Sequence, residues 1–289
     1  MRPSAVPEIP KRRPVLGLPS AAVNGRWFGG KRFPSTMGDA LSLLFPEGER
    51  FFVESVRHYL PDLRDPRLRA EVEAFIAQEA AHGRAHRAFN QQLRDGAQPI
   101  AAELEREVRA LLDLVRRVFS PMSQLAITCA LEHFTALLAE HLMREADHRE
   151  AIDPAVRPLW LWHALEESEH KSVAFDVYQA AGGGYVRRVL IMLATTTVFF
   201  AVTHRFQQRL LDASGGPLTP EERREAFEHV WGPRGVLRAQ LGSWLTYFRP
   251  GFHPTDHDSA ELIAWCRTHL FGPGGPLAHG ADDDAAVAA

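Results

Sequence analysis

The chain has 289 residues, of which 45% are hydrophobic, enough to bury the core of one large domain. Its net charge of −3 provides no global field for binding nucleic acid or an acidic membrane. The two cysteines, Cys129 and Cys266, lie far apart in apolar settings, which excludes a disulfide framework and a thiolate zinc site. The first residues contain no continuous apolar stretch of the kind that directs secretion, so we expect a cytoplasmic protein.

The two ends of the chain are rich in proline and glycine, and both are expected to be non-helical. Residues 1–38 include the basic run Lys11–Arg13, and we interpret them as an extended basic arm. We favour a solvated arm, and contact with a nucleic acid or a lipid headgroup is the alternative. Residues 272–289 are expected to form a disordered tail.

Between these ends, apolar residues recur every three or four positions, and no long alternating run predicts a β-strand. We therefore predict an all-α protein, with a metal-binding bundle over 39–211 and a C-terminal helical extension over 212–271. Glycine and proline place the helix boundaries. The predicted helices are 39–60 (interrupted near Pro46), 67–94, 101–118, 121–146, 155–180, 186–211, 219–231, 234–247 and 258–270.

The helix over 186–211 is unusually apolar, with an uncharged run over 189–203 that is flanked by basic residues. A spanning helix needs about 20 residues, so this run is short for a membrane. We favour burial against the bundle, because the threonines in the run suit a protein core. Peripheral or inserted membrane association is the alternative, and it would favour a lipid-like substrate.

Two of the predicted helices carry a Glu-x-x-His spacing on an apolar stripe. This spacing places a carboxylate and an imidazole one turn apart on one helix face. The two pairs are Glu79 with His82 and Glu167 with His170. A third copy, Glu145 with His148, lies in a polar run at a helix end, and we interpret it as accidental.

His163 lies one turn before Glu167 and therefore shares the face of Glu167 and His170. A buried helix that turns two imidazoles and a carboxylate inward must satisfy them, because an unpaired buried charge costs several kcal/mol. A metal ion can satisfy all three groups. Taken alone, His163 fits a hydrogen-bonded core histidine equally well.

The same phase argument selects two further carboxylates. Glu49 is in phase with Phe45 and Phe52, and Glu132 is in phase with a stripe of small and apolar residues. Glu54 follows the solvated face of its helix and is the reserve candidate.

Each of these residues has an alternative interpretation. Glu49 could be a helix N-terminal charge, and the pair Glu79 and His82 a surface ion pair. His86 fits a supporting or surface residue better than a ligand, and Cys129 fits a small buried residue. His133 falls about 100° from the inward face of its helix.

One Glu from each of two helices, with a Glu-x-x-His from each of two others, is the ligand pattern of dinuclear carboxylate bundles. An oxygen-rich donor set suits iron or manganese better than a closed structural zinc site. We therefore predict two bound iron ions, with manganese as an alternative and zinc less suited. The predicted ligands are Glu49, Glu79, His82, Glu132, His163, Glu167 and His170.

Over about residues 35–255, the chain resembles a bacterial family catalogued as predicted metal-dependent hydrolases and grouped with the ferritin-like proteins. The resemblance rests on the segments FPEGERFF, EAFIAQEAAHGRAHRAFN, ALEHFTALLAE, WHALEESEHKSVAFDVY and YFRPGFHP. It implies a ferritin-like helical bundle that carries a di-metal carboxylate site and additional C-terminal helices.

The run from His163 to His170 also resembles the di-iron arylamine N-oxygenases, which have an extra histidine one turn before the last Glu-x-x-His. This resemblance implies that Glu79 and Glu167 bridge the two metals. It further implies the distribution of the other ligands: Glu49 and His82 at one metal, and Glu132, His163 and His170 at the other.

We expect an enzyme that oxidises or oxygenates a small organic substrate, which could be apolar, with O₂ and an electron donor. A metal-dependent hydrolase that uses a metal-bridging hydroxide is the alternative enzyme class. A metal storage bundle and a metal-free interaction protein are the non-enzymatic alternatives. The sequence contains no His-Glu-x-x-His, Gly-x-Ser-x-Gly or phosphate-binding glycine motif. It does not identify the substrate, the electron donor or the oligomeric state.

Overall fold

The computed structural model describes residues 9–19 and 22–278, and within these ranges it contains helices and no β-strand. The predicted all-α fold is confirmed. The α-helices are α1 (Arg32–Arg57), α2 (Pro66–Asp95), α3 (Ala101–Val118), α4 (Pro121–Arg144), α5 (Ala146–Ala151), α6 (Arg157–His170), α7 (Val173–Ala180), α8 (Tyr185–Ala213), α9 (Pro220–Trp231), α10 (Val236–Thr246) and α11 (Ala260–Phe271). Two short 3₁₀ helices are η2 (Leu60–Asp62) and η3 (Pro254–Asp256).

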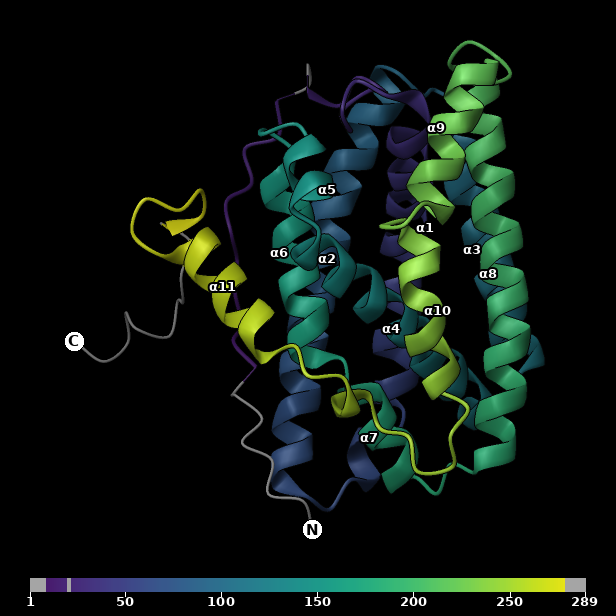
Figure 1. Ribbon diagram of the computed structural model, residues 1–289. Helices are drawn as coiled ribbons and strands as arrows, with labels where there is room; N and C mark the ends of the chain where they lie inside the picture. The colour runs from purple at the N-terminus through teal and green to yellow at the C-terminus, as the bar shows by residue number, and fades with distance from the viewer. Residues whose placement is uncertain (1–8, 20–21, 279–289) are drawn as a thin grey trace.

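Helices α1, α2, α4 and α6 form the centre of an elongated bundle (Figure 1). The first of them packs against α2, α3, α4 and α8, whereas α4 packs against α6, α7, α8 and α10. Helices α9 and α10 run lengthwise along the front of the bundle in Figure 1, and α11 packs against α6 at its left side. The C-terminal helices therefore cover the same bundle that contains the predicted ligands.

Three helices begin at a proline that directly follows a capping side chain. Asp65, Ser120 and Thr219 accept hydrogen bonds from backbone N–H groups in the first turns of α2, α4 and α9. Proline loses no hydrogen bond at a first helical position, because the N–H there has no partner within the helix. These local signals explain why the three predicted starts agree with the structure to within one residue.

Helix α1 differs from its prediction at both its start and its middle. It begins at Arg32, inside the segment expected to be extended, and it continues through Pro46. A proline inside a helix leaves the carbonyl four residues earlier without its donor. Here that carbonyl is Ser42 O, and Asn90 Nδ2 on α2 donates to it at 3.0 Å. The tertiary contact replaces the missing helical hydrogen bond.

The single helix predicted over 155–180 is two helices, α6 and α7. The break falls at residues 171–172, directly after His170. The buried ammonium of Lys171 donates to Glu140 on α4 and to Ser259 before α11. These partners are distant in sequence, so the periodic pattern of 155–180 could not reveal the break.

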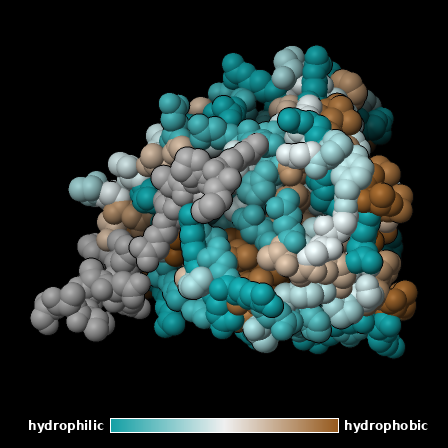
Figure 2. All heavy atoms as spheres, turned by 90° about the horizontal axis from the view of Figure 1, so that it is seen from below, coloured by the Kyte–Doolittle hydropathy of each residue, from teal (hydrophilic) through white to brown (hydrophobic). Residues whose placement is uncertain are grey.

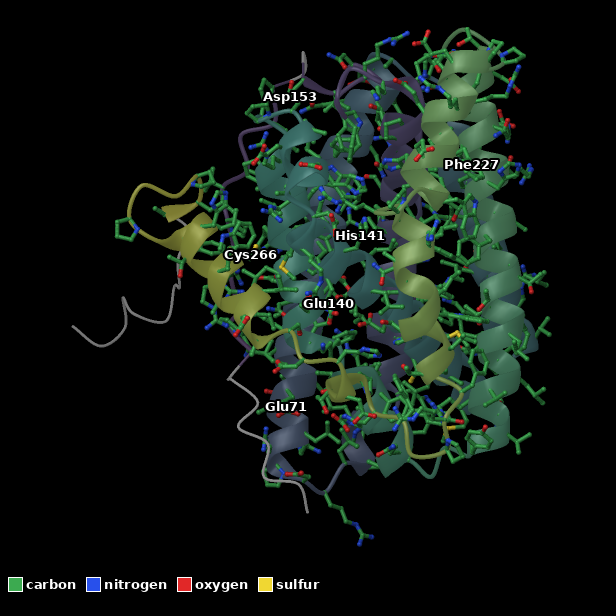
Figure 3. All side chains as sticks on the ribbon, in the orientation of Figure 1. Glu71, Glu140, His141, Asp153, Phe227 and Cys266 are labelled. Carbon is green, nitrogen blue, oxygen red and sulfur yellow. The ribbon has the colours of Figure 1, made fainter. Side chains whose placement is uncertain are left out.

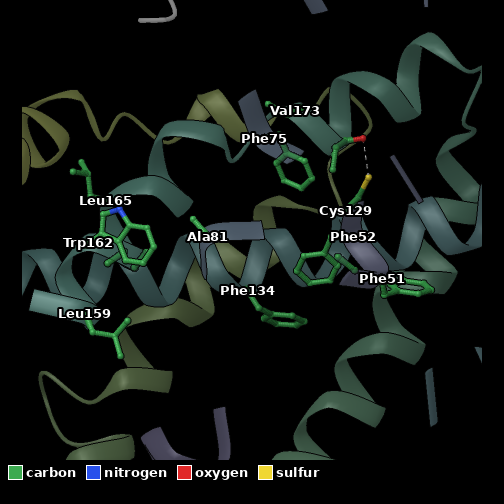
Figure 4. Close-up of a cluster of buried hydrophobic side chains, with 14 of the residues drawn as sticks. Phe51, Phe52, Phe75, Ala81, Cys129, Phe134, Leu159, Trp162, Leu165 and Val173 are labelled. Atoms are coloured by element: carbon green, nitrogen blue, oxygen red, sulfur yellow. Dashed lines mark hydrogen bonds between the residues drawn. The ribbon is translucent and has the colours of Figure 1, made fainter. Parts of the chain in front are cut away.

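Aromatic and aliphatic side chains of the central helices form the hydrophobic core (Figure 4). Phe75 on α2 and Trp162 on α6 are fully buried there. Each fully buried side chain of this size stabilises the fold by about 1.5–3 kcal/mol. Cys129 is buried, and its thiol donates to Ala174 O at 3.3 Å, as expected for a small core residue.

The expected solvated arm is wrong at Arg12. This side chain is buried and forms ion pairs with Glu166 at 3.1 Å and with Glu169 at 2.6 Å, both on α6. Residues 1–8 and 20–21 of the expected arm lie outside the described residues.

The ordered structure at the C-terminal end also extends beyond the predicted last helix. Cys266 on α11 faces α6, where its thiol donates to Leu161 O at 3.5 Å (Figure 3). Leu277 is buried, and its backbone N–H donates to Leu270 O, so residues 272–278 of the expected disordered tail pack on α11. Residues 279–289 lie outside the described residues.

Helix α8 packs against α1 and α4 along one side and is exposed along the other. Among the described residues, α4 and α8 are long and apolar enough to cross a membrane by length and composition. In α4, 67% of the apolar 18-residue stretch is buried, as in the core helix of a soluble protein. In α8, only 17% of the corresponding stretch is buried. The predicted burial of 189–203 therefore holds for one side of the helix.

Candidate metal centre

The seven predicted ligands converge in the middle of the bundle, and each is at most 4% exposed. They come from four helices: Glu49 from α1, Glu79 and His82 from α2, Glu132 from α4, and His163, Glu167 and His170 from α6. The inward orientation predicted from helix phase is confirmed for Glu49, whereas Glu54 lies at the surface beside Arg116. Their role as metal ligands stays a prediction.

Six of the seven residues form two adjoining groups, and within each group one donor atom per residue lies within 4.8 Å of the others, whereas Glu132 belongs to neither group. The groups are Glu49, His82 and His163, and Glu79, Glu167 and His170. Two carboxylates connect them. Glu167 Oε1 lies 2.9 Å from His163 Nε2, and its Oε2 lies 3.6 Å from His170 Nε2. Glu79 Oε1 lies 3.5 Å from His82 Nδ1 and 3.1 Å from His170 Nε2.

The position of His163 differs from the one implied by the N-oxygenase resemblance. That resemblance placed His163 with Glu132 and His170 around one metal. In the structure, His163 stacks on His82 with ring centroids 4.3 Å apart, and its Nε2 lies 3.9 Å from Glu49 Oε1. Glu132 does lie beside His170, with Oε2 3.5 Å from Nε2. The third histidine therefore belongs to the Glu49 side of the centre.

Nine donor atoms of this cluster are buried and have no hydrogen-bond partner. They are both carboxylate oxygens of Glu49, Glu79 and Glu132, Oε2 of Glu167, Nδ1 of His82 and Nε2 of His170. One unsatisfied buried polar group costs about 1–3 kcal/mol, so nine in one place require a common partner. Metal cations fit this donor set, because every unsatisfied atom is a carboxylate oxygen or an imidazole nitrogen.

The buried carboxylates repel one another, and their pKa values separate. Burial and the charge of Glu79 raise the pKa of Glu49 well above its usual value. Burial and the charge of Glu167 do the same for the pKa of Glu132. Burial opposes the charging of His82, but the hydrogen bond to Glu166 and the negative charges of Glu79 and Glu166 outweigh it and raise the pKa of His82. Protons thus balance the carboxylate charge, and a metal ion must displace them.

Each Glu-x-x-His pair is supported by the residue that precedes the glutamate of the other pair. Glu166 Oε2 accepts from His82 Nε2 at 3.1 Å, and Gln78 Oε1 accepts from His170 Nδ1 at 2.8 Å. The amide of Gln78 donates to Pro10 O, so its oxygen must face the ring. Each histidine therefore donates from one nitrogen and presents the other, unprotonated in the neutral ring, to the carboxylates. Such support fixes the tautomer that a metal ligand needs.

A hydrogen-bond relay fixes the tautomer of His163. Asn90 Nδ2 donates to Ser42 O and to Glu105, so Asn90 Oδ1 accepts the Ser42 hydroxyl proton at 2.6 Å. Ser42 Oγ must then accept from His86 Nδ1, at 2.8 Å. The remaining nitrogen of neutral His86 accepts from His163 Nδ1 at 2.7 Å. His163 Nε2 is left unprotonated 2.9 Å from Glu167 Oε1, so this contact needs a proton or a metal ion shared between the two atoms.

The pKa values of the relay agree with this assignment. Burial and the charge of His163 lower the pKa of His86 well below its usual value, and burial with the charge of His82 lowers the pKa of His163. Both rings are therefore neutral near pH 7. His86 supports His163 from behind and is not among the converging donors, as the sequence favoured.

The remaining candidates lie outside the centre. His133 is buried among Tyr247 and Phe252, with ring centroids 5.0 and 5.3 Å away. In the third Glu-x-x-His copy, His148 Nδ1 lies 2.9 Å from His141 Nε2 at the end of α4. Neither histidine joins the two donor groups.

Sequence reasoning missed the residues that support the ligands. Gln78 and Glu166 had a usable signal, because each precedes a motif glutamate and shares its apolar stretch. Ser42, Asn90 and Arg12 had none, because their partners lie on other elements. Arg12 binds the same Glu166 carboxylate that supports His82, so the N-terminal segment reaches the edge of the centre.

A family model described as "Predicted metal-dependent hydrolase" matches residues 10–258, which include all seven converging residues and Arg12. No curated protein and no solved structure matches the chain.

Proposed function

The chain belongs to the family of predicted metal-dependent hydrolases, and on that premise we propose that it is an enzyme with a dinuclear metal centre. The seven converging glutamates and histidines would hold the two metals, and Glu167 and Glu79 would connect them. We further propose that the metals are iron and that the reaction is an O₂-dependent oxidation of a small organic substrate.

The observation that carries the proposal is the cluster of nine buried donor atoms without partners. Four glutamates carry four negative charges when ionised, which equals the charge of two divalent cations. Carboxylate oxygens with imidazole nitrogens suit iron or manganese, and no thiolate in the described residues joins the cluster. Burial of an unbalanced carboxylate cluster would otherwise be strongly unfavourable.

Bound iron would supply redox chemistry toward O₂ and the substrate. The chain's own residues would orient the ligands and exclude water. Gln78, Glu166 and His86 hold the outer nitrogens of the three imidazoles, so the inner nitrogens face the carboxylates. Phe45 packs against His163, with ring centroids 4.6 Å apart, and shields this side of the centre.

Oxidation is favoured over hydrolysis by the space beside Glu49. This cavity is lined by apolar side chains, apart from Glu49 itself and the hydroxyls of Thr135 and Thr195. Hydrolysis needs water and a group that protonates the leaving group. The described wall of the cavity offers no acid or base besides Glu49.

Hydrolysis is the second candidate, because the family description favours it. The same carboxylates and imidazoles can bind zinc or manganese, which support hydrolysis without a change of oxidation state. A storage role is distinguished from both by the amount of iron taken up.

Two parallel assays separate these functions. Reduced, iron-loaded protein should consume O₂ in an oxygen electrode, and Glu132→Ala should slow this at least tenfold. Glu145→Ala removes a glutamate outside the centre and should leave the rate unchanged. Anaerobic, zinc-loaded protein should not hydrolyse p-nitrophenyl acetate or bis(p-nitrophenyl) phosphate faster than Glu132→Ala does. Full anaerobic hydrolysis would refute the oxidation proposal, and uptake of many iron ions per chain would indicate storage.

A further inference from the structure

An apolar cavity of about 180 Å³ lies between α1, α3, α4 and α8. Each of these helices contributes aliphatic or aromatic side chains to its wall, and the polar side chains there are Glu49, Thr135 and Thr195. A charged or sugar-like molecule would lose its hydrogen bonds to water in such a space and find few replacements. The cavity therefore suits a hydrocarbon group.

The inner end of the cavity reaches the metal centre. Glu49 lines the cavity and also belongs to the donor group with His82 and His163. Both of its carboxylate oxygens are buried and have no hydrogen-bond partner. Phe45, one turn before Glu49 on α1, also lines the cavity and packs against His163. A molecule in the cavity would thus meet the centre at Glu49.

The outer end opens where the end of α3 meets α8. Phe119 and Val198 line the cavity and are also 39% and 48% exposed, so they mark its mouth. Val118, Leu190 and Leu193 add exposed apolar surface on the same two elements. Seen from below, hydrophobic residues gather along the right edge of the molecule, the side on which α8 lies in Figure 1 (Figure 2).

Gly48 keeps the cavity open from the side of α1. It lies inside the helix, where glycine costs about 0.5–1 kcal/mol relative to alanine. It lines the cavity, and a Cβ added there would meet no atom within 4 Å. The missing side chain therefore leaves space that a ligand can use.

We propose that the substrate carries an unbranched alkyl chain, which enters between α3 and α8 and lies in this cavity with one end at Glu49. A reaction at the Glu49 end of the alkyl chain rests on the proposed function, whereas binding of the alkyl chain does not depend on it. A methylene is about the size of a water molecule and occupies about 30 Å³, so the cavity of about 180 Å³ holds about six methylenes. A longer chain would extend through the mouth along the exposed side of α8.

Binding of 1-alkanols from butanol to decanol, measured by isothermal titration calorimetry, tests the proposal. Each added methylene should tighten binding about fourfold, which corresponds to about 0.8 kcal/mol, until about six carbons are enclosed. The gain per methylene should then fall. Absence of binding, or an affinity independent of chain length, would overturn the proposal.

Two variants fill the cavity from opposite walls. Gly48→Leu on α1 and Ala194→Phe on α8 should each weaken 1-octanol binding at least tenfold. Gly242→Leu is the matched control, because Gly242 is an exposed helical glycine outside the cavity whose added Cβ also meets no atom within 4 Å. If both cavity variants fold and bind octanol as the control does, the proposal is wrong.

Metal content measured on the same samples keeps the two proposals apart. Octanol binding without bound metal would refute the proposed function and leave the alkyl site in place. Metal without octanol binding would refute the alkyl site alone. Co-sedimentation with phosphatidylcholine vesicles identifies the source of the chain: sedimentation indicates uptake from a bilayer, and its absence with octanol binding indicates a soluble amphiphile.

Discussion

Removal of one hydroxyl, by Ser42→Ala, tests how the relay behind His163 controls the centre. In the structure, Ser42 Oγ accepts from His86 Nδ1 and donates to Asn90 Oδ1. Without the Ser42 hydroxyl, a proton on His86 Nδ1 has no acceptor. The tautomer with the proton on Nε2 becomes favourable, because Nε2 faces His163 Nδ1. His86 would then donate to His163 Nδ1, and the proton of His163 would move to Nε2. That is the nitrogen a metal needs unprotonated.

Ser42→Ala removes two hydrogen bonds, and we expect it to lower both the unfolding free energy and the metal affinity. Two buried groups, His86 Nδ1 and Asn90 Oδ1, are then without a partner, at about 1–3 kcal/mol each before relaxation. We expect the unfolding free energy of the metal-free protein to fall by about 2–4 kcal/mol. Loss of a group that orients a metal ligand weakens metal binding by about 10- to 100-fold, which is our expectation for Ser42→Ala.

Ser55→Ala is the control, because Ser55 lies on the same helix and is equally part of the core. Its hydroxyl donates to Phe52 O at 2.9 Å and lies 2.7 Å from Thr128 Oγ1, away from the ligands. Urea unfolding with a chelator gives the stability of each variant, and competition with a chromogenic chelator gives its metal affinity. Both variants should lose stability, but only Ser42→Ala should lose affinity. Equal metal affinities would refute the relay.

Three further predictions concern other buried charged groups. Burial raises the pKa of Asp39 to about 7 from its ordinary value near 3.8. The folded state therefore binds an extra proton between pH 4 and 7, and stability falls as pH rises through that range, by up to about 4 kcal/mol. Asp39→Asn should remove this slope in urea unfolding, and an unchanged slope would contradict the assignment. Arg12→Met should lower stability by about 3–5 kcal/mol, because it leaves Glu166 buried without its ion pair, whereas exposed Arg13→Met should not. Dialysis below neutral pH should release metal, because the raised pKa of His82 favours its proton over the metal, and metal content independent of pH would argue against that ligand.

The sequence was sufficient for much of the fold, because the helix signals are local. The capping residues Asp65, Ser120 and Thr219 precede prolines, and they mark starts that need no tertiary information. The inward orientation of Glu49 and Glu132 could also be predicted locally, because each residue belongs to an apolar stripe of its own helix.

The features that the sequence did not predict depend on contacts between distant residues. Helix α1 continues through Pro46 because Asn90 donates to a carbonyl of α1. The start of α1 at Arg32 accompanies an ion pair with Glu222, 190 residues later. The crossed support by Gln78 and Glu166 required knowledge that α2 and α6 face each other. Neither periodicity nor spacing contains that information.

Helix α8 shows a different limit of sequence patterns. The short length of its apolar run and the threonines in it predicted burial, but the pattern could not show that only one side would be covered. The exposed side carries Leu190 and Leu193, and the covered side carries Thr195 beside the cavity. The alkyl-chain proposal arises from this division, which only the packing of α8 against α1 and α4 reveals.

Metal analysis of the chain purified without chelator, and after anaerobic iron loading, is the decisive measurement for the dinuclear centre. We expect about two iron or manganese ions per chain. We expect almost none in Glu167→Ala, because the two oxygens of Glu167 face opposite donor groups. A chain that binds no metal after loading, or a Glu167→Ala variant that retains both ions, would contradict the dinuclear centre.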